Sequence, residues 1–384
     1  MDSDANVNMV VDRTTTLIEA AREGHKDVVL LLLDRGADVN KRATDTTALI
    51  AAVEGGHKDV VSLLLDRGAD LNMVVHDTTA LVAAAKKGLK DIVSLLLGRG
   101  ADVNMVVCDT TALIAAAEEG YKDIVSLLLH RGADVNMIVY DTTVLMAAIT
   151  IVATKGHACV EIVRLLLDRG ADLNAVTGQY GTALIAAICM CNDHLPTNDS
   201  KQQALLLMLL DRNPDVSIKA GVYGTALIAT ISKLHFEVTE QSNHNQQDTV
   251  DAQFSSGWQW DFLNKLLSSS YLTTQDHLNV AVGEHGTPLA AAITKGNLQL
   301  LRLLVQCGGN IGSVGDSCGI ALRAALATGW GSQQLYDILQ YLVDEGADIN
   351  VVSSQQFGSV LGQAAYMGDT RLVSFLLGCP YEMA

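Results

Sequence analysis

The chain of 384 residues is predicted to fold as an all-α repeat solenoid of about ten helix-turn-helix repeats. A Thr-x-Leu tripeptide returns every 32 residues, with its leucine at Leu17, Leu49, Leu81, Leu113 and Leu145. A Gly-Ala-Asp-x-Asn segment returns with the same period, beginning at Gly36, Gly68, Gly100 and Gly132. Between these marks lie an alanine-rich run, a glycine turn and a leucine-rich run. A fixed period of this length indicates repeats that bury their faces on one another, so the array counts as one elongated domain.

Each element of a repeat follows from its residues. Thr111 precedes the first helix, where its hydroxyl can cap an unpaired backbone N–H. Residues 115–117 are alanines, which favour helix and let it lie close to its neighbours. After a turn at Gly120, residues 124–129 are apolar over more than one face, which suits a helix buried between repeats. Gly132 is then expected to end this second helix.

The repeats become less regular along the chain. Residues 1–139 are near-copies of the 32-residue unit, whereas residues 140–384 are expected to be irregular repeats with insertions near 150–159, 192–203 and 236–256. The last insertion has the composition of a flexible loop, and a helical pattern resumes at 258–267 as the second helix of the same repeat. A domain boundary at this loop is the alternative. The first helices are predicted to begin near Thr16, Ala48, Ala80, Ala112, Val144, Ala183, Ala226, Pro288, Ala321 and Val360.

The pattern resembles the ankyrin repeat, whose signature is Thr-Pro-Leu-His near the first helix and Gly-Ala-Asp-Val-Asn after the second. Residues 120–136 carry the second part most clearly, and residues 286–289 contain the family's proline. The resemblance implies short β-hairpin fingers between repeats. The family's usual histidine after the leucine is absent throughout, and in seven repeats an apolar residue stands there: Ile18, Ile50, Val82, Ile114, Met146, Ile185 and Ile228. The early fingers are also one residue short and lack the usual tip glycine, so they are expected to be either tighter or irregular.

An ankyrin array implies a non-enzymatic protein-protein interaction module. Such arrays act as scaffolds, inhibitors or transcriptional co-regulators through the concave surface of finger tips and first helices, although a fold alone does not choose among functions. The alternative is the sensor portion or a degenerate paralogue of a NACHT-type signalling ATPase. A third class, an enzyme with its site in residues 192–256, lacks support because no phosphate-binding loop, nucleophile elbow or His-Glu-x-x-His helix occurs. We therefore expect neither catalysis nor a cofactor.

Composition narrows the partner and the compartment. The net charge is −17 and neither half of the chain is basic, so direct nucleic-acid binding is not expected and a protein with a basic surface fits better. No stretch of about 18 apolar residues suggests a membrane span, and the acidic start is unlike a signal peptide. We therefore expect the cytoplasm or nucleus, and the 7 scattered cysteines, an odd number, are consistent with reduced thiols there. The array is expected to be monomeric.

Candidate contacts are the positions that vary on the constant scaffold. Four residues past each finger asparagine, the five early fingers carry Asp12, Thr44, His76, Cys108 and Tyr140. Drift at exposed loop positions is the alternative reading. Lys86 and Lys87, at the end of a first helix, are further candidates that could orient an acidic ligand group, and ordinary solvated charge is their alternative.

Three further patterns carry weaker signals. Four fingers carry a pair of adjacent apolar residues, Val10-Val11, Val74-Val75, Val106-Val107 and Ile138-Val139. One residue of each pair is expected to face outward, where the row could form a ridge for an apolar partner segment. The alternative is that these side chains pack between adjacent fingers. Cys189, Cys191 and His194 lack a second ligand pair, so no metal site is expected. The family's Gly-His turn position implies structural roles for His25, His57 and His157. Finally, Asn40, Asn72, Asn104 and Asn136 resemble sites modified by asparaginyl hydroxylases.

Overall fold

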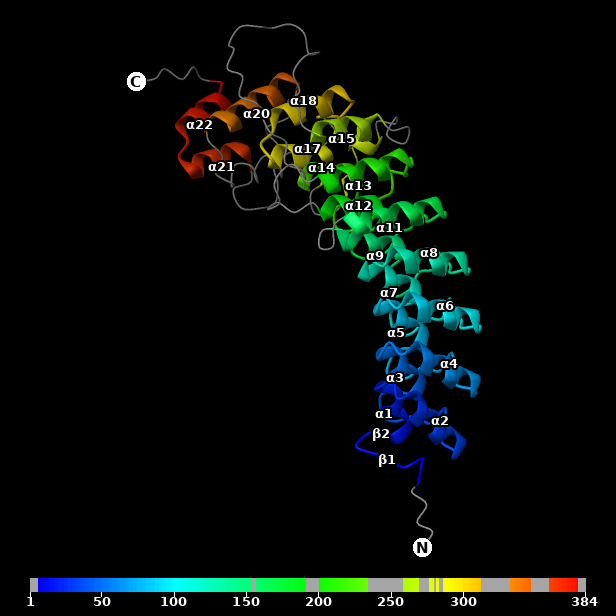
Figure 1. Cartoon of the computed structure of the whole chain (residues 1–384). Helices are drawn as coiled ribbons and strands as arrows, with labels where there is room; N and C mark the ends of the chain where they lie inside the picture. The colour runs from blue at the N-terminus through cyan, green and yellow to red at the C-terminus, as the bar shows by residue number, and fades with distance from the viewer. Residues whose placement is uncertain are drawn as a thin grey trace. The chain divides into compact units, whose positions relative to one another are not determined.

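The computed structural model describes residues 6–152, 157–190, 200–233, 258–268, 276–279, 281–282, 286–311, 332–346 and 359–378. They form two compact units, Met1–Asp172 and Leu173–Ala384. In both units short antiparallel helices follow one another in pairs (Figure 1). The predicted all-α repeat solenoid is confirmed.

The first unit stacks helix pairs in chain order. First helices contact first helices of the next repeat, and second helices contact second helices, as for α3 with α5 and α4 with α6. A two-residue strand pair, β1 and β2, opens the unit. Its elements are β1 (Val10–Val11), β2 (Thr14–Thr15), α1 (Thr16–Arg22), α2 (Lys26–Asp34), α3 (Ala48–Glu54), α4 (Lys58–Asp66), α5 (Ala80–Lys86), α6 (Lys90–Gly98), α7 (Ala112–Glu119), α8 (Lys122–His130), α9 (Val144–Thr150) and α11 (His157–Asp168).

The second unit continues the same helix pairing with longer intervals. Helix α15 contacts α13 and α14, so it takes the expected place of a second helix after the long insertion. The elements are α12 (Ala183–Cys189), α13 (Ser200–Asp211), α14 (Ala226–Lys233), α15 (Trp258–Leu267), α16 (Asp276–Asn279), α17 (Pro288–Thr294), α18 (Leu298–Gln306), α20 (Ser332–Asp344), α21 (Val360–Met367) and α22 (Thr370–Leu376). Nine of the ten predicted first-helix starts are confirmed across the two units, and Ala321 lies outside the described residues.

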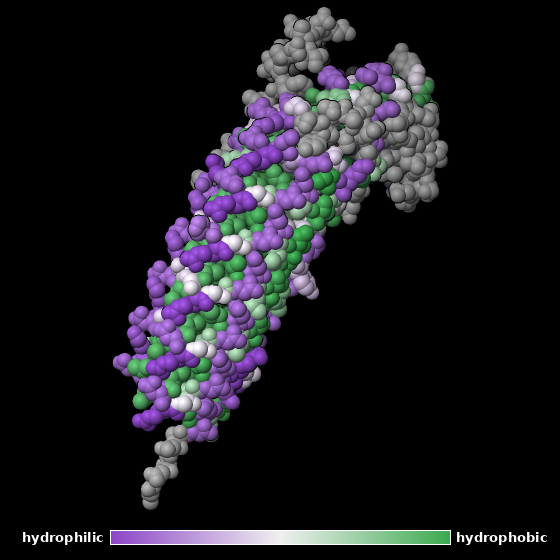
Figure 2. All heavy atoms as spheres, turned by 90° about the vertical axis from the view of Figure 1, so that its right-hand side faces the viewer, coloured by the Kyte–Doolittle hydropathy of each residue, from purple (hydrophilic) through white to green (hydrophobic). Residues whose placement is uncertain are grey.

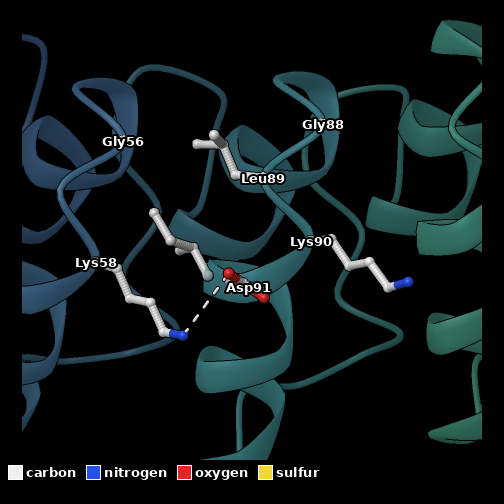
Figure 3. A pocket seen from close by; sticks show the side chains of 7 residues that line it. Gly56, Lys58, Gly88, Leu89, Lys90 and Asp91 are labelled. Carbon is white, nitrogen blue, oxygen red and sulfur yellow. Dashed lines mark ion pairs between the residues drawn. The ribbon is translucent and has the colours of Figure 1, made fainter.

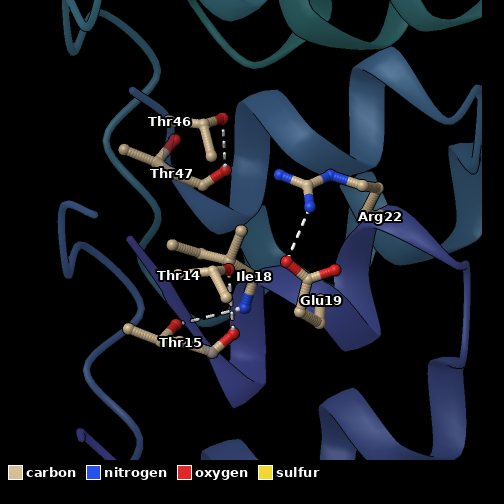
Figure 4. Close-up of polar contacts among 7 residues, drawn as sticks. All are labelled: Thr14, Thr15, Ile18, Glu19, Arg22, Thr46 and Thr47. Atoms are coloured by element: carbon tan, nitrogen blue, oxygen red, sulfur yellow. Dashed lines mark hydrogen bonds and ion pairs between the residues drawn. The ribbon is translucent and has the colours of Figure 1, made fainter. Parts of the chain in front are cut away.

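Threonine caps set where the first helices begin. The Thr15 hydroxyl accepts a hydrogen bond from the Ile18 N–H at 3.2 Å, and Glu19 pairs with Arg22 one turn along the same helix (Figure 4). Thr111 caps α7 in the same way through the Ile114 N–H at 3.2 Å. Because a capped N–H needs no water, these threonines can be buried at the repeat junctions, where Thr111 is only 4% exposed.

Glycine ends the second helices as predicted. Gly132 has φ +90°, its N–H donates to the Leu129 carbonyl, and the Ala133 N–H donates to the Leu128 carbonyl at 3.0 Å. These two bonds satisfy carbonyls at the end of α8 and turn the chain toward the next finger.

The core of each unit lies between first and second helices. In α7 all six residues from Ala112 to Ala117 are buried, whereas α8 buries Ile124, Val125 and Leu128 and leaves its other positions partly or fully exposed. The alanines permit close stacking, and the larger side chains of α8 cover them. On the side of the second helices, polar and apolar bands recur along the repeats of the first unit (Figure 2).

Candidate partner-binding surface

Asparagine side chains tie each finger of the first unit to the next. Asn104 Oδ1 accepts a hydrogen bond from the Asp134 N–H at 2.8 Å, and Asn104 Nδ2 donates to the Gly132 carbonyl at 3.3 Å. Asn40 and Asn136 make the same two bonds to the repeat that follows each. The asparagines that resemble hydroxylation sites are therefore structural connectors that hold the fingers in register.

The finger tips are tight two-residue turns. Val75 and Thr78 exchange both hydrogen bonds, at 3.0 and 3.1 Å, with only His76 and Asp77 between them. Both tip residues have left-handed backbones, with φ +46° and +60°, as this hairpin turn requires. Such conformations persist in non-glycine residues when the surroundings enforce them, here through the bridge and the asparagine bonds.

The first longer finger of the second unit confirms the expected difference in length. Its bridge joins Thr177 to Gly181 across three residues, and both Gly178 and Gly181 have positive φ. The early fingers, with two residues between their bridge residues, are thus tighter, which is one of the two outcomes expected for them.

Four of the five variable tip residues share the left-handed conformation. Asp12, Cys108 and Tyr140 join His76 with φ between +48° and +51°. Thr44 is not among them, because a β-branched side chain disfavours this conformation. All five are exposed, and Tyr140 retains 81% of its surface. The structure therefore places these five residues along one row of the first unit, one to a finger.

A constant aspartate beside the variable residue connects neighbouring tips. Asp45 pairs with Arg13 of the previous finger at 2.6 Å and lies 3.9 Å from Nδ1 of His76 on the next. A hydrogen bond from the Cys108 thiol to Asp77 raises the pKa of that thiol above its ordinary value, and the nearby Asp77 and Asp109 charges add to the rise. The sequence analysis does not predict these aspartates as contact residues, because it selects positions that differ between repeats. The aspartate is the same in four fingers, as Asp45, Asp77, Asp109 and Asp141.

The apolar finger pairs divide between solvent and core. Val74, Val106 and Ile138 are 39%, 49% and 58% exposed, while the residue after each is buried. In these three pairs one residue faces outward, as expected from strand alternation. The prediction is wrong for the first pair, because Val10 and Val11 are both exposed, at 46% and 52%. Arg42 occupies the outward position of the second finger, so the exposed apolar row is interrupted there.

The two candidate lysines lie apart from the tips. Lys86 is the last residue of α5, whose first residue follows the finger, so the helix separates the lysines from His76 by roughly 10 Å along its axis. Both side chains are exposed, and Lys87 Nζ donates to the Glu54 carbonyl of the preceding repeat at 2.7 Å. The seven candidate residues therefore fall into two places.

Neither a cluster of metal-binding side chains nor a membrane-spanning helix is present among the described residues. No group of three or more His, Cys, Asp or Glu side chains among them could hold a metal ion. Cys189 is half-buried, and burial raises the pKa of its thiol to about 12, whereas Cys191 and His194 lie outside the described residues. In the same part of the chain no helix is long and apolar enough to cross a bilayer.

Stacked helix pairs joined by projecting fingers define a helical repeat solenoid, a class that offers extended surfaces for binding. Sequence models of the ankyrin repeat match residues 1–75 and 73–139 as "Ankyrin repeats (3 copies)" and residues 140–178 as "Ankyrin repeat". The crystal structure of the human ASB11 ankyrin repeat domain is 31% identical in sequence over 53% of this chain and 87% of that chain, with a TM-score of 0.45. No curated protein matches the chain in sequence. The chain belongs to the ankyrin repeat family, and its repeats form a protein-protein interaction module.

Proposed function

We propose that this protein is a non-enzymatic scaffold of the cytoplasm or nucleus that holds a partner protein on its finger tips. The observation that supports this most directly is the row of five variable, exposed tip residues on a frame of repeated hydrogen bonds. A rigid frame lowers the entropy cost of binding, and variable side chains on it provide specificity. Inhibition or transcriptional co-regulation would use the same surface with a different partner.

The aspartates of the tips favour a partner with a basic segment. Asp77, Asp109 and Asp141 are exposed, and the whole chain carries a net charge of −17. A row of negative charges accelerates association with a positively charged partner and disfavours binding of an acidic partner at the same row. Outward apolar residues such as Val106 and Ile138 lie two positions before the variable tip residues and would add contact area for the same segment.

Proximity labelling in the native cell tests this proposal. A His76→Ala, Tyr140→Ala double variant removes two large tip side chains, and a His130→Ala, Tyr366→Ala double variant removes the same residue types at exposed positions elsewhere. We expect one defined neighbour to disappear with the tip variant and to persist with the control. If both variants keep the wild-type neighbours while their far-ultraviolet circular dichroism is unchanged, the tips are not the binding surface.

The alternative, a sensor portion or degenerate paralogue of a NACHT-type signalling ATPase, makes a different prediction for the same experiment. Its neighbours would be components of a nucleotide-dependent signalling assembly, and their recovery would depend on ATP. Recovery of one tip-dependent neighbour that ATP depletion does not change would favour the scaffold.

A further inference from the structure

A pocket of about 410 Å³ opens at the turns of the second and third repeats of the first unit. Its walls include Gly56, Leu89 and Ile92, with Lys58 and Asp91 at the rim. Figure 3 shows Leu89 between the two turns and Lys58 reaching toward Asp91, while Lys90 points toward the following repeat. The pocket lies at the C-terminal end of α5, opposite the end that follows the finger.

In the neighbouring repeats an aromatic ring fills the corresponding place. The His57 ring lies so close to Gly24 that a Cβ on that glycine would be 2.4 Å from Nδ1, and His57 Nε2 is 2.9 Å from the Arg22 carbonyl oxygen. The Tyr121 ring covers Gly88 similarly, with 2.7 Å to Cζ. His57 thus has the structural role expected of it, while His25 is exposed and the side chain of His157 lies outside the described residues.

Leu89 occupies this position in the third repeat and fills less of it. The nearest atom to a Cβ on Gly56 would be Leu89 Cδ2 at 3.8 Å, which is ordinary contact. The floor stays apolar, because Ile92 is only 2% exposed. The place that a ring fills in the neighbouring repeats is therefore only partly filled here, beside a pocket that opens to solvent.

Two of the residues that line this pocket are lysines, Lys58 and Lys90, and Lys90 pairs with Asp123 of the following repeat at 3.0 Å. Lys58 Nζ is 3.8 Å from Asp91 Oδ2, a long contact between exposed groups, and such a pair yields readily to a competing carboxylate. Lys87 donates to the carbonyl of Glu54, two residues before Gly56. Lys86 and Lys87 stand where the other regular repeats have Arg22-Glu23, Glu54-Gly55 and Glu118-Glu119.

We propose that the pocket beside Leu89 receives an aromatic side chain from an acidic segment of a partner protein. The ring would take the place that His57 and Tyr121 take in their own repeats, and carboxylates beside it would meet Lys58 and Lys87. Aromatic anchors in desolvated pockets supply a large share of interface affinity. Lys87, one residue before the Gly88 wall of the pocket, would thereby have a role separate from the finger tips.

Fluorescence polarisation with the full chain tests this inference. The probe is a fluorescein-labelled nonapeptide of Asp, Glu and Gly with a central Phe, compared with a central Ala and with Lys in place of every acid. We expect the Phe peptide to bind about tenfold or more tightly than the Ala peptide. When Lys replaces every acid in both peptides, the preference for Phe over Ala should become smaller, whatever binding the finger tips contribute. An equal or larger preference would contradict the acidic assignment.

Substitutions at Leu89 locate the binding. Leu89→Tyr and Leu89→His copy the ring of a neighbouring repeat into the pocket and should abolish the preference for Phe. Leu30→Tyr adds a ring at an exposed leucine of α2 and should preserve it. The His76→Ala, Tyr140→Ala variant should also preserve it, because the tips lie at the other end of the first helices, and this result separates the pocket from the finger-tip proposal.

Nuclear Overhauser contacts in the wild-type chain keep the inference testable if the Leu89 variants fail to fold. Cross-peaks between the peptide ring and the methyl groups of Leu89 and Ile92 are expected. Their absence under saturating peptide, or unchanged Phe preference in a folded Leu89→Tyr variant, would overturn the proposal.

Discussion

Removing one connector asparagine should loosen the junction between two repeats by a predictable amount. Asn104→Ala deletes the acceptor for the Asp134 N–H at 2.8 Å and the donor to the Gly132 carbonyl at 3.3 Å. A hydrogen bond contributes about 0.5–1.5 kcal/mol net, and water can reach these exposed backbone groups once the side chain is gone. We therefore expect a loss of about 1–2 kcal/mol at this junction.

Asn72→Ala is the matched control, because the structure gives Asn72 one such bond, to the Asp102 N–H at 3.0 Å. Its expected loss is about 1 kcal/mol or less. Urea unfolding followed by circular dichroism gives the overall effect, and hydrogen exchange at the Asp134 amide reports the junction directly, since repeat arrays unfold in units. If exchange at Asp134 in Asn104→Ala matches the wild type, the asparagine does not hold the fingers and the rigid frame is wrong.

Two other predictions concern single residues. Gly88→Ala places a Cβ 2.7 Å from the Tyr121 ring at a residue with φ +74°, whereas Gly132→Ala meets open space at φ +90°. Both variants should lose about 1–2 kcal/mol of folding stability because of the left-handed backbone, and Gly88→Ala should lose more because of the ring. Equal urea midpoints for the two variants would refute the contact with Tyr121. Asp77→Asn replaces the carboxylate whose hydrogen bond and charge both raise the Cys108 pKa, so more thiolate should form at a given pH. Alkylation of Cys108 by iodoacetamide, followed by peptide mass spectrometry, should then reach its half-maximal rate at a lower pH. An unchanged pH profile would contradict the cause assigned to the shift.

Local signals in the sequence were sufficient for the repeat and its boundaries. Thr111 caps one helix and Gly132 ends another through hydrogen bonds that span no more than about four residues of the chain. Such short-range interactions can be predicted from the sequence. Alternation likewise predicts that one of Val74 and Val75 is exposed. The period then supplies the fold, since identical units can bury their apolar faces only on one another.

Contacts between residues of different repeats could not be predicted from such local signals. Three such contacts join residues about 31 to 33 positions apart, and their distances depend on how two helix pairs stack. They are the pair Asp45 and His76, the packing of His57 on Gly24, and the hydrogen bond from Lys87 to the Glu54 carbonyl. The pocket beside Leu89 is an example, because its walls come from two repeats and a leucine at a turn does not by itself indicate a pocket. Local propensity and period thus decided the helices, their ends and the family, while side-chain volume and distance between stacked repeats decided which surfaces this array offers to a partner.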